Sequence, residues 1–353
     1  MSRIVASRTC YPPHYYDQDQ LIAAFRDVWG QRHFNVDRLE QFHRNVMVGG
    51  RHLALPLEKY AALKGFGDSN AAWLDAAVDL AENTVQSLLD SVDARPEEIQ
   101  LLVSTTVTGI AVPSLEARLM NRIAFQTDTR RMPLFGLGCL GGAAGISRAA
   151  EYLRGHPDHA AILIALEFCS LTLQREDLSI ANIVSSGLFG DGAAAVLLAG
   201  EKHRLYNSQG PAILDNASIF FPNTERVMGW DMVDTGFKVV LDSTVPEFAR
   251  EHLRPGISAF LARHELTVAD IGEWVAHPGG PKVIDAMEDG LEIGKGTLDL
   301  SRESLQKVGN LSSVSVLNIL EETMQRKAHQ AGDYGVLLAM GPAFCAEAIL
   351  YRW

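Results

Sequence analysis

Cysteine and positive charge are scarce in this sequence of 353 residues. The four cysteines have no metal-type spacing, and a chain this long does not need disulfides for stability, so we expect reduced thiols, no bound metal and a cytoplasmic protein. Lysine and arginine total 31 against 43 aspartates and glutamates, which gives a formal net charge of −12. This balance argues against a general nucleic-acid binder, because phosphate contacts need clustered basic residues.

Long apolar runs and phosphate-binding motifs are missing as well. No uninterrupted apolar run approaches the roughly 20 residues that cross a bilayer, so we expect no membrane span. The N-terminal stretch MSRIVASRTCYPPHYYDQDQ lacks the apolar core and the cleavage site of a secretory signal. There is no GxxxxGK[ST] loop, and GLGCLGGAAG only loosely imitates a dinucleotide-binding fingerprint.

The chain does contain alternating strand-like and helix-like segments, which predict an α/β fold. The strand-like segments are almost continuously apolar, as strands covered by helices on both faces are. We expect strands at 99–109, 161–168, 193–200, 273–280 and 335–341, and helices at 70–92, 114–124, 142–154, 245–264, 281–291 and 312–329.

An internal repeat connects these segments. With an offset of about 171 residues, the strand and loop that end at Gly109 fall on those that end at Gly280, and Thr106 falls on His277. Further along, VLLAG before residue 201 resembles VLLAMG before residue 342. The alternative is a chance match of apolar strands, because identities are few. We interpret the pattern as a duplication.

The duplication divides the chain into an N-terminal half, 1–205, and a C-terminal half, 206–353. At the same offset Cys139 falls on Asn310, and a helix follows each of them. Two similar halves packed about a pseudo-twofold axis would place these two residues at helix N-termini that face one another. His277 would lie on a neighbouring loop.

These three residues have the chemistry of nucleophilic acyl transfer. The glycines around Cys139 permit a tight turn and a close approach, and a helix N-terminus lowers the pKa of a thiol. His277 follows an apolar strand, where α/β folds place ligand-binding residues. Asn310 would donate a hydrogen bond to developing negative charge. The alternatives are a packed turn for Cys139 and a helix N-cap for Asn310.

Four ordered motifs resemble the type III polyketide synthases, the chalcone synthase-like condensing enzymes. They are GCLGG around Cys139, SSGLFGDGAAAVLLAG at 185–200, WVAHPGGPKVID at 274–285 and VGNLSS at 308–313. The resemblance implies an α/β thiolase fold with five αβαβα layers built from two duplicated halves. It also implies a homodimer that needs no metal, no cofactor and no acyl carrier protein.

The resemblance also implies the roles of the three residues. Cys139 would hold the starter acyl group and the growing chain, taken from acyl-CoA and malonyl-CoA. His277 and Asn310 would polarise the malonyl thioester carbonyl, so that loss of carbon dioxide gives an enolate. Repeated Claisen condensation of that enolate onto the Cys139 thioester would extend the chain before cyclisation.

Five further positions match the family's substrate cavity. Phe189 matches a gating phenylalanine, whereas Val239 replaces a second one. Cys169 stands where a threonine is common, and Thr172 is retained. Val112 matches a residue that reaches across the dimer into the partner's cavity.

The smaller gate and the cysteine-lined wall suggest a channel for a long alkyl chain. TGIAVPSLEARL, at 108–119, is similar to the bacterial branch, whose members often use fatty acyl-CoA starters. We therefore expect a long-chain acyl-CoA starter and an alkyl α-pyrone or alkylresorcinol product.

The basic segment RLEQFHRNVMVGGRH contains Arg38, Arg44 and Arg51 and stands in the region where the family binds the phosphates of CoA. Arg38 and Arg44 are the candidates for this contact, although a solvated helical face explains these arginines nearly as well. Three other functions remain open. A β-ketoacyl synthase III-like enzyme would perform a single condensation, but His277 is followed by Pro-Gly-Gly and not by the Gln-Ala-Asn typical of that group. A cysteine thioesterase and a non-catalytic thiolase-fold partner are the others.

Overall fold

A long mixed sheet runs through the molecule. In the computed structural model, which describes residues 1–30 and 35–353, nine strands pair in the order β11-β12-β13-β8-β1-β7-β6-β4-β5. Between β1 and β8 the pairing is short, with Ser2 opposite Ile213 and Arg3 opposite Ala212. The sheet therefore consists of two sheets that meet at one edge. The strands are β1 (Ser2–Cys10), β4 (Leu101–Thr105), β5 (Arg130–Leu134), β6 (Ala160–Phe168), β7 (Asp191–Gly200), β8 (Ala212–Phe220), β11 (Ile271–Ala276), β12 (Tyr334–Gly341) and β13 (Cys345–Arg352).

The two sheets have the same topology. Strand β4 is parallel to β6 as β11 is parallel to β12, and the next two pairings along each sheet are antiparallel, through β7 to β1 and through β13 to β8. The predicted duplication is thus visible in the strand order. One detail of it was wrong: VLLAG lies in β7 and VLLAMG in β12, whereas the topology matches β12 with β6 and β13 with β7.

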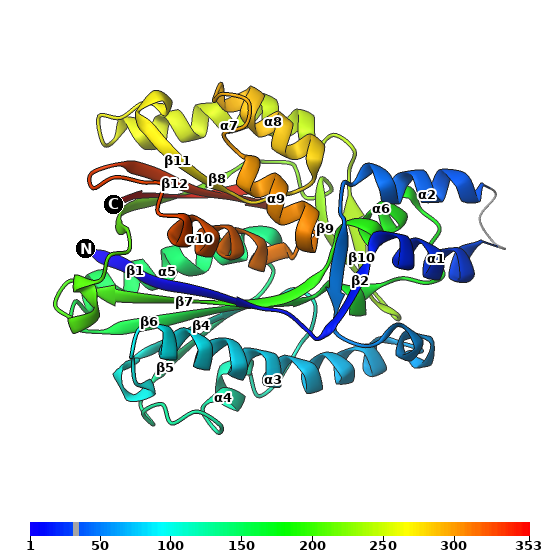
Figure 1. Ribbon diagram of the computed structural model, residues 1–353, viewed down its shortest axis with the longest axis horizontal. Coiled ribbons are helices and arrows are strands. Elements are labelled where there is room, and N and C mark those ends of the chain that lie inside the picture. Colours follow the sequence, from blue (N-terminus) through cyan, green and yellow to red (C-terminus); the bar gives the residue numbers. More distant parts are fainter. Residues whose placement is uncertain (31–34) are drawn as a thin grey trace.

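Figure 1 shows that the helices and the two sheets form five layers. Helices α3 and α4 cover the outer face of the first sheet, α5 and α10 lie between the sheets, and α7 and α8 cover the outer face of the second. This is the predicted thiolase fold. The helices are α1 (Gln18–Trp29), α2 (Val36–Asn45), α3 (Phe66–Ser91), α4 (Leu115–Leu119), α5 (Gly141–Gly155), α6 (Ile180–Leu188), α7 (Val245–Ala262), α8 (Pro281–Leu291), α9 (Asp299–Val308) and α10 (Ser315–Arg326).

Smaller elements gather at one end of the layers, on the right of Figure 1. The strands β2 (His14–Asp17) and β3 (Gly50–Leu53) pair there, as do β9 (Met228–Val233) and β10 (Gly236–Leu241). Helices α1, α2 and α6 lie at the same end. This end contains the cavity described below.

Each predicted strand and helix is present, although several ends differ. Helix α4 ends at Leu119, five residues before the predicted end, and turns follow it. Strands β1 and β8 were missed because SRIVASRTC and AILDNASIF mix polar with apolar residues. The predicted boundary between the halves lies in the connection from β7 to β8 and stays a prediction. Within the described part of the chain, no helix combines the length and the apolar character that crossing a membrane requires.

The glycines that begin α5 serve the contact between the two halves. A Cβ on Gly142 would lie 2.2 Å from the backbone oxygen of Ser313, and one on Gly141 would lie 3.3 Å from Cβ of Ser313. Ser313 belongs to the 3-10 turn before α10. The sequence predicted a close approach at these glycines, and the structure shows that this segment of the other half makes it.

Gly142→Ala should therefore destabilise the protein by about 1–3 kcal/mol, because its methyl group meets backbone that cannot move aside. Gly155→Ala, at the other end of the same helix, is the matched control, because a Cβ there has nothing within 4 Å. We expect the control to change stability by less than about 1 kcal/mol. Urea unfolding of both variants checks this, and equal effects would contradict the packing argument.

Candidate functional site

Cys139 lies at the entrance of α5, in a short 3-10 turn (Gly138–Leu140). Gly136 and Gly138 both have positive φ, at 87° and 53°, which favours glycine and lets the chain turn sharply out of the segment after β5. The cysteine is 6% exposed and lines a cavity. This geometry matches the predicted helix entrance.

The thiol of Cys139 contacts the other half of the chain. Its Sγ donates to Oγ of Ser312 over 3.7 Å. Ser312 has a φ of +52°, a strained conformation for a residue with a side chain, and such strain is often found at functional sites. Burial raises the pKa of the Cys139 thiol to about 12, although the Ser312 hydroxyl acts in the opposite direction. The thiol is therefore protonated at neutral pH.

His277 lies directly after β11, as predicted. Its backbone N–H donates to the carbonyl oxygen of Leu338 in β12 (2.9 Å), and its own carbonyl accepts from Gly279 (3.0 Å). The side chain is 3% exposed, and its Nδ1 is buried without a hydrogen-bond partner in the described residues. Burial lowers the pKa of His277 to about 3, so the imidazole is neutral at neutral pH.

Asn310 lies between α9 and the turn before α10. Its Oδ1 accepts from the backbone N–H of Ser312 (2.8 Å), which uses the oxygen end of the amide and leaves its donor end, Nδ2, for another partner. The backbone of Asn310 donates to Leu188 and accepts from Gly190, both at 2.9 Å. The alternative of a helix N-cap for Asn310 is wrong, because Leu311 is the N-cap of the 3-10 turn and Val314 is that of α10.

The fold joins Cys139 and Asn310 through Ser312, whereas the described structure records no contact of the His277 side chain with either of them. Ser312 contacts both Cys139 and Asn310. Gly138 packs against Pro342 at the end of β12, and His277 follows the neighbouring parallel strand β11. The predicted equivalence of Cys139 and Asn310 is off by three residues, since α5 begins at residue 141 and α10 at residue 315.

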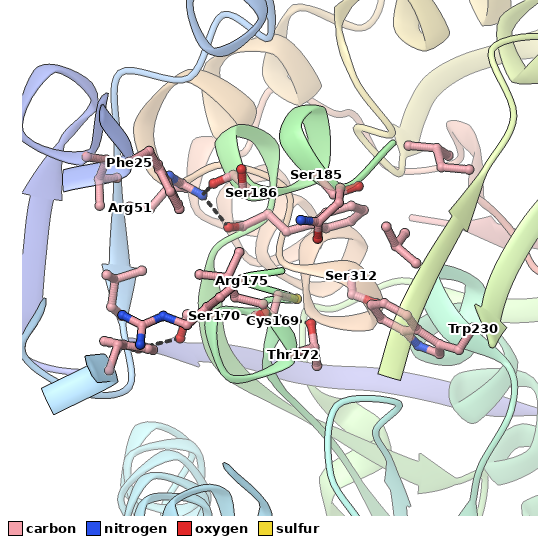
Figure 2. A pocket seen from close by; sticks show the side chains of 18 of the residues that line it. Phe25, Arg51, Cys169, Ser170, Thr172, Arg175, Ser185, Ser186, Trp230 and Ser312 are labelled. Carbon is pink, nitrogen blue, oxygen red and sulfur yellow. Dashed lines mark hydrogen bonds between the residues drawn. The ribbon is translucent and has the colours of Figure 1, made fainter. Parts of the chain in front are cut away.

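The cavity beside Cys139 has a volume of about 340 Å³. Four of the predicted cavity residues line it, namely Phe189, Val239, Cys169 and Thr172. Figure 2 shows Cys169 and Thr172 on one side, with Ser185 and Ser186 of α6 above them and Trp230 of β9 across from them.

The other predicted residues, His277 and Asn310 among them, are not part of the wall of this cavity. Val112 is 90% exposed on the surface, so it does not reach the cavity of its own chain. Arg44 is exposed on α2 and forms ion pairs with Asp19 (2.9 Å) and Glu40 (2.8 Å). Arg38, on the same helix, places its guanidinium 5.5 Å from the centre of the Phe42 ring. The structure thus supports the solvated-face alternative for these arginines as much as a CoA contact.

A buried carboxyl group that the sequence did not reveal joins the two halves near the thiol. Glu167, at the end of β6, accepts from Ser313 Oγ (2.6 Å), from the backbone of Val107 (3.1 Å) and from Thr108 Oγ1 (3.0 Å). Burial raises its pKa to about 7, against those hydrogen bonds. In the sequence, the one feature that could have identified Glu167 is its position as a single glutamate inside the apolar run AAILIALEF.

Other cavity residues lacked a recognisable motif. Arg51, Tyr60, Ser170 and Arg175 all line the cavity, and Arg51 belongs to the basic segment noted in the sequence. Among the residues that the structure describes, no three histidine, cysteine or acidic side chains are grouped as a metal site requires.

Comparison with known proteins extends these observations over the whole chain. Residues 212–353 match the family described as chalcone and stilbene synthases, C-terminal domain, and residues 63–210 match the family described as FAE1/type III polyketide synthase-like protein. A 1,3,6,8-tetrahydroxynaphthalene synthase from Streptomyces peucetius subsp. caesius is 47% identical over 99% of this chain and 93% of its own length.

Two more distant proteins are also similar to this chain over nearly its whole length. A phloroglucinol synthase from Pseudomonas fluorescens is 28% identical over 100% of this chain and 99% of its own length. The crystal structure of 1,3,6,8-tetrahydroxynaphthalene synthase from Streptomyces coelicolor A3(2) superposes with a TM-score of 0.93 at 29% identity and covers 99% of both chains.

The raised pKa of Cys139 predicts how its reactivity depends on pH. Because only the thiolate is alkylated, the rate with iodoacetamide should rise about tenfold per pH unit from pH 7 to 9 without a plateau. Peptide mass spectrometry measures this rate at Cys139 itself, and Cys139→Ala gives the background. A plateau below pH 8 would show that a thiolate–imidazolium pair already exists in the free protein.

Proposed function

Because this chain belongs to the type III polyketide synthases, we propose that Cys139, His277 and Asn310 carry out its condensation of malonyl-CoA. One observation supports this above the others. Ser312 contacts both the Cys139 thiol and the Asn310 amide, the backbone of Asn310 pairs with that of Phe189, and Cys139, Ser312 and Phe189 line one cavity.

In the first step, the Cys139 thiol attacks the thioester carbonyl of an acyl-CoA. Its proton passes to the neutral imidazole of His277. CoA then leaves as a thiolate, which takes this proton from the imidazolium. Burial disfavours the charged forms of both side chains, so the ion pair need form only as the substrate reacts.

In the second step, the carbonyl oxygen of malonyl-CoA accepts hydrogen bonds from Asn310 Nδ2 and from His277. Fixed donors in a site without water stabilise the negative charge that develops as carbon dioxide leaves. The resulting enolate attacks the acyl group on Cys139, the carbon–sulfur bond breaks, and the extended chain is carried on CoA. Return of that chain to Cys139 begins the next cycle.

For the starter, we propose malonyl-CoA, with a small polyhydroxylated aromatic compound as the product. The relative at 47% identity is named for 1,3,6,8-tetrahydroxynaphthalene. Ten ring carbons with oxygen on alternate positions correspond to five two-carbon units, which malonyl-CoA alone can supply. Hydroxyl groups on the cavity wall suit the keto oxygens of such a chain; they belong to Tyr60, Ser170, Thr172, Ser185 and Ser186.

A long-chain acyl-CoA starter, giving an alkyl α-pyrone by lactonisation or an alkylresorcinol by aldol closure, is the second candidate. The observation that favours it is the apolar part of the cavity wall, to which Leu21, Phe25, Leu173, Trp230 and Val239 contribute. In either case we propose a homodimer in which Val112 enters the partner's cavity, and CoA phosphates that meet Arg38 and Arg44.

Mass spectrometry of the products distinguishes the two starters. With malonyl-CoA alone we expect an aromatic polyketide, and addition of a panel of acyl-CoA thioesters from two to sixteen carbons should leave it the main product. Alkyl pyrones or resorcinols formed in preference would support the second candidate. Free acid formed from acyl-CoA without malonyl-CoA would indicate a thioesterase, and release after one condensation would indicate the synthase III-like alternative.

Substitutions test the three roles separately. Cys139→Ala should abolish product, because no thioester can form. Asn310→Ala should slow malonyl-CoA decarboxylation about 10²–10³-fold, the usual effect of losing one oxyanion donor. Cys10→Ser, in β1 and away from the cavity wall, is the matched control for the cysteine and should retain activity. Full product formation by Cys139→Ala would refute the nucleophile assignment.

A further inference from the structure

Arg51 is a buried cation next to the proposed site. It lies in β3, opposite Tyr16 of β2, and only 2% of it is exposed, yet it lines the cavity. Its Nη1 donates to two backbone carbonyls at the end of α6, those of Ser186 (2.5 Å) and Phe189 (2.7 Å). The guanidinium therefore fixes the point at which α6 ends and the Phe189 position begins (Figure 2 shows Arg51 and Ser186).

The aliphatic part of Arg51 lies against two glycines from different halves of the chain. A Cβ on Gly309 would lie 3.0 Å from Cγ of Arg51, and one on Gly190 would lie 3.4 Å from its Cβ. Gly309 has a φ of +75°, which a side chain rarely tolerates. The absence of side chains at both positions lets the arginine pack closely between the two segments.

Those segments are paired with each other. Asn310 donates through its backbone to Leu188 and accepts from Gly190, and Phe189 and Asn310 form an isolated parallel bridge. A displacement of the Phe189 carbonyl would therefore move the backbone of Asn310. Because Asn310 Oδ1 is bonded to Ser312, the contacts continue from Arg51 to the partner of the Cys139 thiol.

The charge of Arg51 survives burial. Desolvation lowers its pKa to about 10, against the attraction of the buried Asp191, so the guanidinium stays charged at neutral pH. Asp191 itself accepts from the backbone of Ala54 and from Ser170, and no direct hydrogen bond joins it to Arg51 in the described structure. The carbonyls are thus bonded by Nη1 alone, and Nε of Arg51 is buried without a hydrogen-bond partner in the described residues. Charged donors form stronger hydrogen bonds than neutral ones.

We propose that Arg51 is a positioning residue for the condensation: by holding the Ser186 and Phe189 carbonyls, it fixes the Asn310 amide and the gate. This inference rests on the proposed function, which assigns the decarboxylation step to Asn310. Its consequence is specific. Loss of Arg51 should impair the steps that depend on Asn310 more than the reactivity of the Cys139 thiol.

The experiment compares two rates in each full-length variant. The first is decarboxylation of malonyl-CoA to acetyl-CoA, and the second is alkylation of Cys139 by iodoacetamide, which does not involve Asn310. Arg51→Met removes the donors but retains an apolar stem. Arg51→Lys retains the charge on an ammonium group that lacks the planar fork of arginine. Arg263→Met, on the exposed end of α7, is the control for loss of a surface arginine.

In Arg51→Met we expect decarboxylation to fall about 10–100-fold, because displacement of a catalytic group by about 1 Å has effects of this size. Alkylation should change less than about threefold. Arg51→Lys should lie between Arg51→Met and the unmodified protein, and Arg263→Met should match the unmodified protein. If either Arg51 variant decarboxylated malonyl-CoA at the rate of the unmodified protein, the inference would be overturned. A parallel fall in both rates would also overturn it, since it would indicate a general structural role.

Asn310→Ala separates this inference from its premise. If that variant decarboxylates malonyl-CoA normally, the proposed function fails. If it is impaired while Arg51→Met is not, only the role of Arg51 fails. Should Arg51→Met not fold, the Arg51→Lys rates decide by the same criteria.

Discussion

The close contact between α5 and the segment before α10 is the constraint on which the site depends. Both helices lie between two sheets, so their first turns can meet only where side chains are absent or small, at Gly142 and Ser313. Glu167 of the first half reinforces this junction by accepting a hydrogen bond from Ser313 Oγ of the second. The thiol of Cys139 and the amide of Asn310 thereby come together although they are far apart in sequence. A loosely packed interface would not hold them to the fraction of an ångström that catalysis needs.

The same burial controls the charges of the site. It raises the pKa of Cys139 and lowers that of His277, so both side chains are neutral at neutral pH. A resting site without charge suits a reaction that passes through an enolate, because fixed donors then act on the substrate and not on a competing thiolate. The nearby Glu167 also has a raised pKa, and its hydrogen bonds come from four groups of both halves. Burial therefore lets the substrate, and not the protein, carry the charge that develops.

Sequence reasoning proposed the core of the site but not its surroundings. Cys139, His277 and Asn310 could be proposed because glycines, proline and small residues mark sharp junctions between strands and helices, and the structure places all three at such junctions. The offset of the repeat was misjudged by three residues at the second junction, since few identities fix the alignment there. Arg51 and Glu167 could not be assigned, because their partners are backbone carbonyls and hydroxyls that only the folded chain brings near. The missed strands β1 and β8 carry polar residues, which hides their place in the sheet.

The molecule consists of a duplicated core of strands and helices and of elements inserted between the core strands. This division explains why the reaction is easier to infer than the substrate. The thiol, the imidazole and the amide all lie on turns of the duplicated core. Most of the cavity wall comes from elements inserted between core strands: α1, the β9–β10 hairpin and the segment 169–190 with α6. Between β6 and β7 that segment is long, whereas β12 and β13 are joined by residues 342–344 alone. Because the insertions have no counterpart in the other half, duplication does not constrain them, and the starter can change while the chemistry is kept.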